Sequence, residues 1–471
     1  MAKRLRPLSG LDAAFLYLEA AGTPMHVGSV MLLQAPKKKD YDFRSALAAH
    51  VRERLPRAAA LRRVLHDAPL DLGHPLWAET QSLDLDAHIT QHRLTGSGSR
   101  AQLWKVVAEL HAQPLPRDRP LWQFVVIDGL ASGELVLYSK IHHALLDGQG
   151  GMALAQALLD LHPLSANSRT VSRAAPATQS RPLRSGELAS SAIRATTQQF
   201  AKLLRALPTT FKLATDAAVH AGELIGRLRD SVMIAPRTLF NAQVGAHRSY
   251  AVASLPLADV KAVAHHFDAS VNDVVLALCS AALRDYLQRR NALPRERLVA
   301  AMPISLRVAG DSEVNNQVSM VQCALPTDIA DPVARLLAIS AATGQLKRQV
   351  ASFRSLIPTD FPGLAAPIWA TGLSRLWARG HIAERLPSLA NLVVSNIPGP
   401  PVTLFLAGRK VLHYFPVSIV THGLGLNITV NSYAGSLEFG LIACRDIAPR
   451  LESLATGLGR ALRVLVNKAH K

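Results

Sequence analysis

A pair of histidines offers acid–base chemistry in the first third of the chain. His142 and His143 follow the apolar run Leu135–Ile141, and Asp147 and Gly148 come shortly after them. A neutral imidazole is well suited to taking a proton from an alcohol near neutral pH. An aspartate at this spacing could fix the loop or orient an imidazole. The motif therefore indicates a general base held at the end of a strand.

The motif has two other interpretations. His142 and His143 could be a surface pair beside an Asp-Gly turn. A metal site is less favoured, because adjacent side chains on an extended chain point to opposite sides and no Cys or Glu lies nearby at ligand spacing. The Ala-rich stretch Met152–Leu161 predicts a helix after the turn. This strand–turn–helix context favours catalysis, and we expect no bound metal.

The composition limits the class of protein. A chain of 471 residues is too long for one ordinary core, so two domains are expected. Hydrophobic residues make up 49% and charged residues 18%, which predicts a globular chain that is more apolar than usual. No apolar run reaches transmembrane length, and the N-terminus lacks the apolar core of a signal peptide. Three scattered cysteines make a structural disulfide unlikely and fit a cytoplasmic location, with peripheral contact to the inner membrane face or lipid inclusions.

The net charge of +18 favours anionic partners. Nucleic acid is not expected, because aromatic residues make up only 5% and the chain has no zinc-finger or RNP-type motif. An acyl-CoA or an anionic membrane surface suits the dispersed basic residues. The segment 188–232 predicts a basic amphipathic helix, which could pack on a domain surface or contact a membrane.

The order of predicted elements indicates an α/β fold with two comparable domains. We expect an N-terminal domain at 1–164, a connection at 165–248 and a C-terminal domain at 249–471, with the histidine loop where the two domains meet. The elements predicted after residue 248 are strands at 250–255, 298–306, 318–325, 392–395, 412–420, 426–433 and 437–442, and helices at 257–266, 272–288, 332–349 and 448–469.

Asn272 and Asp273 stand where a predicted helix begins. Spacing alone favours Asn272 as the N-cap of that helix. The same amide, near a helix N-terminus, could instead donate a hydrogen bond to a developing oxyanion.

Three further segments carry polar residues beside predicted strands. Arg307 could bind a phosphate or hold Asp147 in place. Ser395 and Asn396 open a Pro-Gly-Pro turn, which is typical of rigid loop geometry. His422 is a competing candidate for the base, although a buried structural role is favoured.

The order of these segments resembles the bacterial wax ester synthase/acyl-CoA:diacylglycerol acyltransferase family. That family belongs to the CoA-dependent acyltransferases with chloramphenicol-acetyltransferase-like and condensation-domain folds. The departure from the family pattern is Asn315-Asn316, where Gly-Asn is frequent. The segments that carry the resemblance are Leu8–Phe15, Thr23–Gly28, Arg119–Trp122, His142–Gly148, Asn272-Asp273, Ser395–Pro400, Asn427–Thr429 and Ser432–Gly440.

The resemblance implies a fatty acyl transfer from acyl-CoA to diacylglycerol or a long-chain alcohol. It implies that His143 is the general base, that His142 supports the site and that Asp147 shapes the loop with Gly148. No cofactor is expected, since acyl-CoA is a co-substrate, and Asn272 is our candidate oxyanion donor. The residues expected to contact substrate are Pro120, Leu121, Trp122, Asp273, Arg307, Ser395 and Asn396.

Two other function classes stay open at the level of sequence. A condensation-type acyltransferase would take its acyl group from a carrier protein instead of CoA. A non-catalytic coat protein would bind lipid droplets or membranes through the 188–232 segment, but it would leave the histidine motif without a role.

Overall fold

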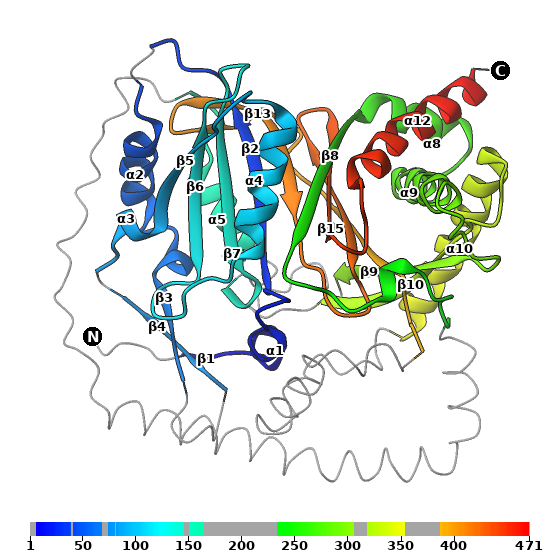
Figure 1. Ribbon diagram of the computed structural model, residues 1–471, viewed down its shortest axis with the longest axis horizontal. Helices are drawn as coiled ribbons and strands as arrows, with labels where there is room; N and C mark the ends of the chain where they lie inside the picture. Colours follow the sequence, from blue (N-terminus) through cyan, green and yellow to red (C-terminus); the bar gives the residue numbers. More distant parts are fainter. Residues whose placement is uncertain are drawn as a thin grey trace, which may run out of the picture.

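The computed structural model describes residues 6–38, 41–67, 74–80, 82–145, 150–163, 233–305, 318–353 and 387–470. Its main feature is a pair of mixed sheets that lie side by side, each packed against helices (Figure 1). This arrangement confirms the α/β class with two sheet-based halves. No helix among these residues is long and apolar enough to cross a membrane.

The first sheet is built around the strand that carries the histidine pair. Its strand order is β12-β13-β2-β7-β6-β5, so β7 lies in the middle of the sheet. A smaller sheet, β1-β4-β3, lies beside it. The strands are β1 (Arg6–Pro7), β2 (His26–Leu33), β3 (Arg63–His66), β4 (Leu76–Glu79), β5 (Ile89–Arg93), β6 (Trp122–Asp128), β7 (Leu135–His142), β12 (Phe405–Leu406) and β13 (Arg409–Val417). The helices of this half are α1 (Gly10–Leu18), α2 (Phe43–Arg54), α3 (Leu85–His88), α4 (Arg100–Ala112) and α5 (Gly150–Leu158), with 3₁₀ turns η1 (Ala59–Arg62) and η3 (His143–Leu145).

The second sheet has the order β10-β9-β11-β14-β15-β8. One of its faces is covered by helices α8, α9, α10 and α12 (Figure 1). Its strands are β8 (Arg248–Pro256), β9 (Leu298–Ser305), β10 (Val318–Leu325), β11 (Leu392–Ile397), β14 (Leu426–Tyr433) and β15 (Ser436–Cys444). The remaining elements are α8 (Leu257–His266), α9 (Val271–Gln288), α10 (Pro332–Phe353), α12 (Leu451–Ala469) and the 3₁₀ turn η4 (Leu239–Asn241).

The two halves are joined by a strand that changes sheets. β13 comes from the C-terminal half but pairs with β2 of the first sheet. At its end it passes β15 so closely that a Cβ added to Gly440 would collide with the Pro416 carbonyl. The Tyr250 hydroxyl donates to that same carbonyl at 2.9 Å. The crossing therefore fixes one half against the other, and it was not predicted from the sequence.

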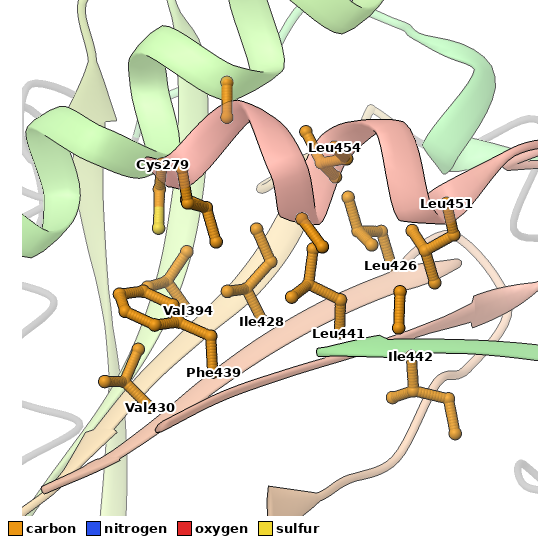
Figure 2. Close-up of a cluster of buried hydrophobic side chains, with 14 of the residues drawn as sticks. Cys279, Val394, Leu426, Ile428, Val430, Phe439, Leu441, Ile442, Leu451 and Leu454 are labelled. Atoms are coloured by element: carbon orange, nitrogen blue, oxygen red, sulfur yellow. The ribbon is translucent and has the colours of Figure 1, made fainter. Parts of the chain in front are cut away.

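Apolar side chains fill the space between α12, α9 and the second sheet (Figure 2). Leu451 and Leu454 of α12 meet strand residues such as Leu441 in this layer. Cys279 of α9 lies in the same core, where burial raises the pKa of its thiol to about 12. Burial also raises the pKa of the Cys323 thiol to about 11. Neither thiol can supply a thiolate nucleophile near neutral pH.

Several predicted elements are confirmed with the same bounds: the helix Leu257–His266 and the strands Val318–Leu325 and Leu426–Tyr433. The predicted helix at 188–232 lies outside the described residues. The division at 164 and 248 stays a prediction, and β12 and β13 depart from it because they complete the first sheet.

Candidate active site

The alternation of β7 sends its side chains to two different environments. Tyr138, Lys140 and His142 point toward α4, while Ser139 and Ile141 point to the opposite face. His142 lies opposite His26 in the antiparallel pairing of β2 with β7. The strand ends there, and η3 begins at once with His143. The two histidines therefore have separate surroundings although they are adjacent in sequence.

His142 is fully engaged inside the protein. Only 1% of its surface is exposed, and its Nδ1 accepts the Ala144 N–H at 3.1 Å. A neutral ring must then carry its proton on Nε2, which lies 3.4 Å from Glu19 Oε1. Nε2 has no hydrogen-bond partner among the described residues, so we treat the contact with Glu19 as an electrostatic attraction. No ring nitrogen of His142 is left to take a proton from a substrate.

His143 has the surroundings of a base. Its ring stacks on Phe15 with centroids 3.9 Å apart and planes 16° apart, and its N–H donates to the Met25 carbonyl. Burial, together with the nearby His142, lowers the pKa of His143 to about 4, despite a contact with its own main chain that raises it. Nδ1 is buried without a hydrogen-bond partner among the described residues. The side chain still keeps exposed surface, which leaves Nε2 as the nitrogen that can meet a substrate.

Glu19 is a component of the site that sequence reasoning missed. Its Oε1 accepts the Met25 N–H at 3.1 Å and its Oε2 pairs with Arg117 at 2.9 Å. Burial would raise the pKa of this carboxyl, but the contacts with His142, Arg117 and the Met25 N–H lower it to about 2. The carboxylate thus holds both Met25 and His142. An acid directly after the apolar stretch Ala13–Leu18 was the signal that could have drawn attention to it.

A buried polar network supports the α4 side of β7. Lys140 Nζ donates to the Leu110 and Gln113 carbonyls, both at 2.9 Å, and so caps the end of α4. His111 Nε2 lies 2.9 Å from the Ser418 carbonyl, which can only accept, so Nδ1 must accept from the Tyr138 hydroxyl at 2.7 Å. Burial lowers the pKa of His111 to about 3, which keeps it neutral. This network ties β7 to both α4 and the C-terminal half.

Pro120, Leu121 and Trp122 lie directly beside the end of β7. The His142 N–H donates to the Leu121 carbonyl at 2.9 Å. Trp122 is 1% exposed, donates from Nε1 to the Leu61 carbonyl at 2.9 Å and stacks on His88. Substrate contact by these three residues stays a prediction. Their geometry favours a role in positioning the histidine pair.

The expectation that Asn272 is an N-cap is wrong. Ser270 caps α9 and forms a capping box with Asp273, because the helix begins one residue earlier than predicted. The Asp273 carboxylate is engaged on both oxygens, with the Ser270 N–H at 2.8 Å and the Thr343 hydroxyl at 2.6 Å. Asn272 therefore lies in the first turn of α9, where its side chain is partly exposed.

The structure brings Asn272 together with Asn396. Asn396 Nδ2 donates to Asn272 Oδ1 at 3.3 Å, which directs the Asn272 NH₂ group away from Asn396. Ser395 pairs with Thr429 in the sheet. No hydrogen bond or ring contact among the described residues joins these side chains to His143.

The turn after Asn396 and the region of His422 have structural roles. A Cβ added to Gly399 would collide with the Ser432 carbonyl, so the turn needs glycine there. His422 is buried, and its Nδ1 accepts the Val244 N–H at 3.1 Å. That contact favours the structural interpretation over the competing base.

Asp147, Gly148 and Arg307 lie outside the described residues, so their roles stay predictions. Within the described ranges, no group of three or more His, Cys, Asp and Glu side chains could hold a metal ion.

Replacing Glu19 by Gln should destabilise the fold in a pH-dependent way. The folded-state pKa of about 2 lies below the ordinary 4.5, so the carboxylate stabilises the native state above pH 4.5. The loss at pH 7 should be on the order of 3 kcal/mol in the free energy of unfolding. This difference should shrink as pH falls from 4.5 toward 2, and urea unfolding at several pH values measures it.

Glu53→Gln is the matched control, because the Glu53 side chain is 74% exposed. It should change the free energy of unfolding by well under about 1 kcal/mol. A Glu19→Gln loss that is the same at every pH would contradict the assigned carboxylate.

Comparison with known proteins places the chain in a family. The profile described as the wax ester synthase/diacylglycerol acyltransferase catalytic domain matches residues 8–275. The profile described as the WS/DGAT C-terminal domain matches residues 314–465. Together they cover the first sheet and every strand of the second sheet except β9.

Named relatives and solved structures are similar to this chain over nearly its whole length. Two Mycobacterium tuberculosis proteins named as diacylglycerol O-acyltransferases are similar to the chain. The first is 33% identical, and the match covers 96% of this chain and 97% of the relative. The second is 35% identical, and the match covers 97% of this chain and 99% of the relative. The wax ester synthase/diacylglycerol acyltransferase from Marinobacter aquaeolei VT8 superposes with a TM-score of 0.69 at 29% identity, covering 99% of this chain and 100% of that one. The first condensation domain of the calcium-dependent antibiotic synthetase, at 15% identity, 99% and 97% coverage and a TM-score of 0.57, shares the fold. The chain therefore belongs to the wax ester synthase/diacylglycerol acyltransferase family.

Proposed function

We propose that this protein transfers a fatty acyl group from acyl-CoA to diacylglycerol or to a long-chain alcohol. The observation that carries the proposal is the state of His143: neutral, enclosed, stacked on Phe15 and still accessible. Membership of the family supports the choice of reaction. The Ala144 N–H on Nδ1 of His142 and the Glu19 carboxylate beside its Nε2 favour His143 as the base of the pair.

The proposed reaction is a direct transfer. His143 Nε2 takes the proton of the alcohol hydroxyl as the oxygen attacks the thioester carbonyl carbon. The tetrahedral intermediate collapses when its carbon–sulfur bond breaks, and CoA leaves as a thiolate. The imidazolium returns its proton to that sulfur, so an ester and a thiol are formed and the base is restored. The buried cysteine thiols take no part.

Asn272 is our proposed donor to the oxyanion of that intermediate. Its position in the first turn of α9 supports this, since the N-terminal end of a helix favours negative charge. The hydrogen bond from Asn396 supports it too, because it leaves the Asn272 NH₂ group as a directed donor.

Peripheral contact with an anionic lipid surface is the proposed location of the reaction. The net charge of +18 supports this, as does a patch of exposed apolar side chains. Ile234 is 72% exposed, Leu389 56% and Met320 53%. The Gln322 side chain joins them, since it bonds to the main chain of Met233 and Leu389 and lies two residues from Met320 on β10.

Replacing His143 by Ala should reduce acyl transfer by about 10²- to 10⁴-fold, because the base is removed. CoA thiol release from palmitoyl-CoA measures this, with hexadecanol and dipalmitoylglycerol as separate acceptors. His92→Ala is the matched control, since His92 is exposed on edge strand β5. Full activity in a folded His143→Ala protein would contradict the proposal that His143 is the base. If the native protein shows no alcohol-dependent release, a carrier-bound acyl donor becomes the better candidate.

The pH profile gives a second readout of the same base. Since the pKa of His143 is about 4, kcat/KM should rise as pH increases through about 4 and stay level from there to neutrality. An ordinary histidine would instead lose its base form below pH 6.5. An acid limb near 6.5 would show that another group titrates.

Replacing Asn272 by Ala should lower kcat by about 10²-fold with little change in KM, because an oxyanion donor acts mainly in the transition state. Asn272→Asp should be at least as damaging, since it brings an acceptor and a negative charge. Steady-state kinetics with palmitoyl-CoA measures both. A higher KM at unchanged kcat would assign Asn272 to substrate binding instead.

Replacing Ile234 and Leu389 together by Ser should weaken binding to anionic vesicles, because apolar contact area is lost. Flotation with vesicles of phosphatidylglycerol and phosphatidylcholine measures the bound fraction. Val464→Ser, on the exposed side of α12 at 45% exposure, is the control. Unchanged flotation of the double variant would exclude this patch as the contact.

A further inference from the structure

Helix α1 lies against the turn η3 that carries His143, near the end of β7 (Figure 1). Phe15 is the member of α1 whose ring meets the histidine. The two rings are nearly parallel, with centroids 3.9 Å apart and planes 16° apart. A stack of this kind covers a face of the imidazole and leaves the nitrogens at the edge of the ring uncovered.

A histidine ring needs an outside contact to hold its plane. The χ2 torsion of histidine is broad, so the main chain does not fix the plane by itself. In many acid–base sites a carboxylate or a carbonyl does this by accepting a hydrogen bond from the second ring nitrogen. Nδ1 of His143 is buried, yet it forms no such bond with any residue that the structure describes. The stack on Phe15 is a contact that can set the plane of this ring.

Phe15 does not belong to the hydrophobic core. Within the described part of the chain, it is absent from the buried apolar clusters and from the side chains packed against them. Its neighbours in α1 differ, because Ala13 and Leu16 are core residues at 0% and 4% exposure. Phe15 itself is half-buried. An aromatic ring that lies outside the core and covers the proposed base favours a role at the site over a role in folding.

The helix that carries Phe15 is anchored at both ends. Ser9 forms the N-cap at its start. At its end, Arg117 Nη2 donates to the Leu16 carbonyl at 3.1 Å and pairs with Glu19 at 2.9 Å. Arg117 comes from the segment between α4 and β6, so these bonds fix α1 to the rest of the N-terminal half. Phe15 is therefore held firmly enough to position the ring on which it stacks.

We infer that Phe15 is a positioning residue, which sets the plane of the His143 ring in place of a hydrogen bond to Nδ1. The inference rests on the proposed function, in which Nε2 of His143 faces the hydroxyl of the alcohol. A ring that turned about χ2 would move Nε2 away from the proton that it takes. Small misplacements of a reacting group lower the rate strongly. The same stack keeps water from one face of the imidazole.

Replacing Phe15 by Leu keeps an apolar side chain but removes the flat ring. The kcat of acyl transfer from palmitoyl-CoA to hexadecanol should fall by at least about tenfold, with little change in KM, because the base is no longer held in place. Phe15→Tyr keeps the flat ring and should keep most of the native kcat. Leu18→Ala is the matched control on the exposed side of α1, at 37% exposure, and should leave kcat unchanged.

The pH profile separates positioning from a loss of folded protein. Burial is the largest cause of the lowered pKa of His143. Phe15→Ala admits water to the ring, so the acid limb of kcat/KM should move upward from about 4 toward 6.5. In Phe15→Tyr the limb should stay where it is in the native protein. A smaller amount of folded protein would instead lower the activity at every pH and leave the limb in place.

A spectroscopic readout tests the stack without acyl transfer. In protein labelled with ¹³C at histidine Cε1, the NMR signal that disappears in His143→Ala belongs to His143. The ring current of Phe15 should shift the proton of that signal upfield in the native protein and in Phe15→Tyr, and this shift should be lost in Phe15→Leu. If the native protein transfers no acyl group while the signal behaves in this way, the proposed function fails and the positioning contact stands.

Three results would overturn the inference. They are an unchanged kcat in folded Phe15→Leu, an unchanged His143 signal in that variant, and a loss of kcat that Phe15→Tyr does not restore. Asp147 would then become the candidate that orients the ring.

Discussion

The end of β7 is held by main-chain hydrogen bonds to distant parts of the chain, and the candidate site depends on them. The His142 N–H donates to Leu121, and the His143 N–H donates to Met25. Glu19 binds the Met25 N–H in turn. Because these contacts are polar and at least partly buried, breaking one would leave an unsatisfied group costing about 1–3 kcal/mol. They therefore fix the main chain that carries the two imidazoles, and the ring contacts with Ala144 and Phe15 then orient the rings.

These main-chain hydrogen bonds hold the two histidines in different surroundings. His142 turns toward α4, where Lys140, His111 and Tyr138 form a satisfied polar network with the C-terminal half. His143 lies in the turn after the strand, and its ring stacks on Phe15 of α1. The strand thus supplies a rigid side, where hydrogen bonds lock the halves together, and its end carries the proposed base. The two adjacent histidines differ in surroundings because the strand ends between them.

Local sequence patterns predicted much of this, and long-range contacts explain what they missed. The apolar run of β7 and its histidine pair were visible because strand and turn are local features. The pairing of β13 with β2 was not, since nothing near Arg409–Val417 identifies a partner almost the whole chain away. Asn272 was misassigned because the helix begins one residue earlier, where Ser270 forms a capping box with Asp273. Glu19 was missed because its partners, Arg117 and His142, are brought to it only by folding.

The low pKa of His143 has a consequence for how the transfer must be driven. A base with a pKa of about 4 is always free of its proton at neutral pH, but it gains less from accepting one than an ordinary histidine does. Removing the hydroxyl proton is then a smaller part of the catalysis, and stabilising the charge on the thioester oxygen a larger part. Enclosure of the ring also strengthens electrostatic interactions with any donor directed at that oxygen. The same burial that weakens the base therefore makes a well-placed oxyanion donor more effective, and the two must be arranged together.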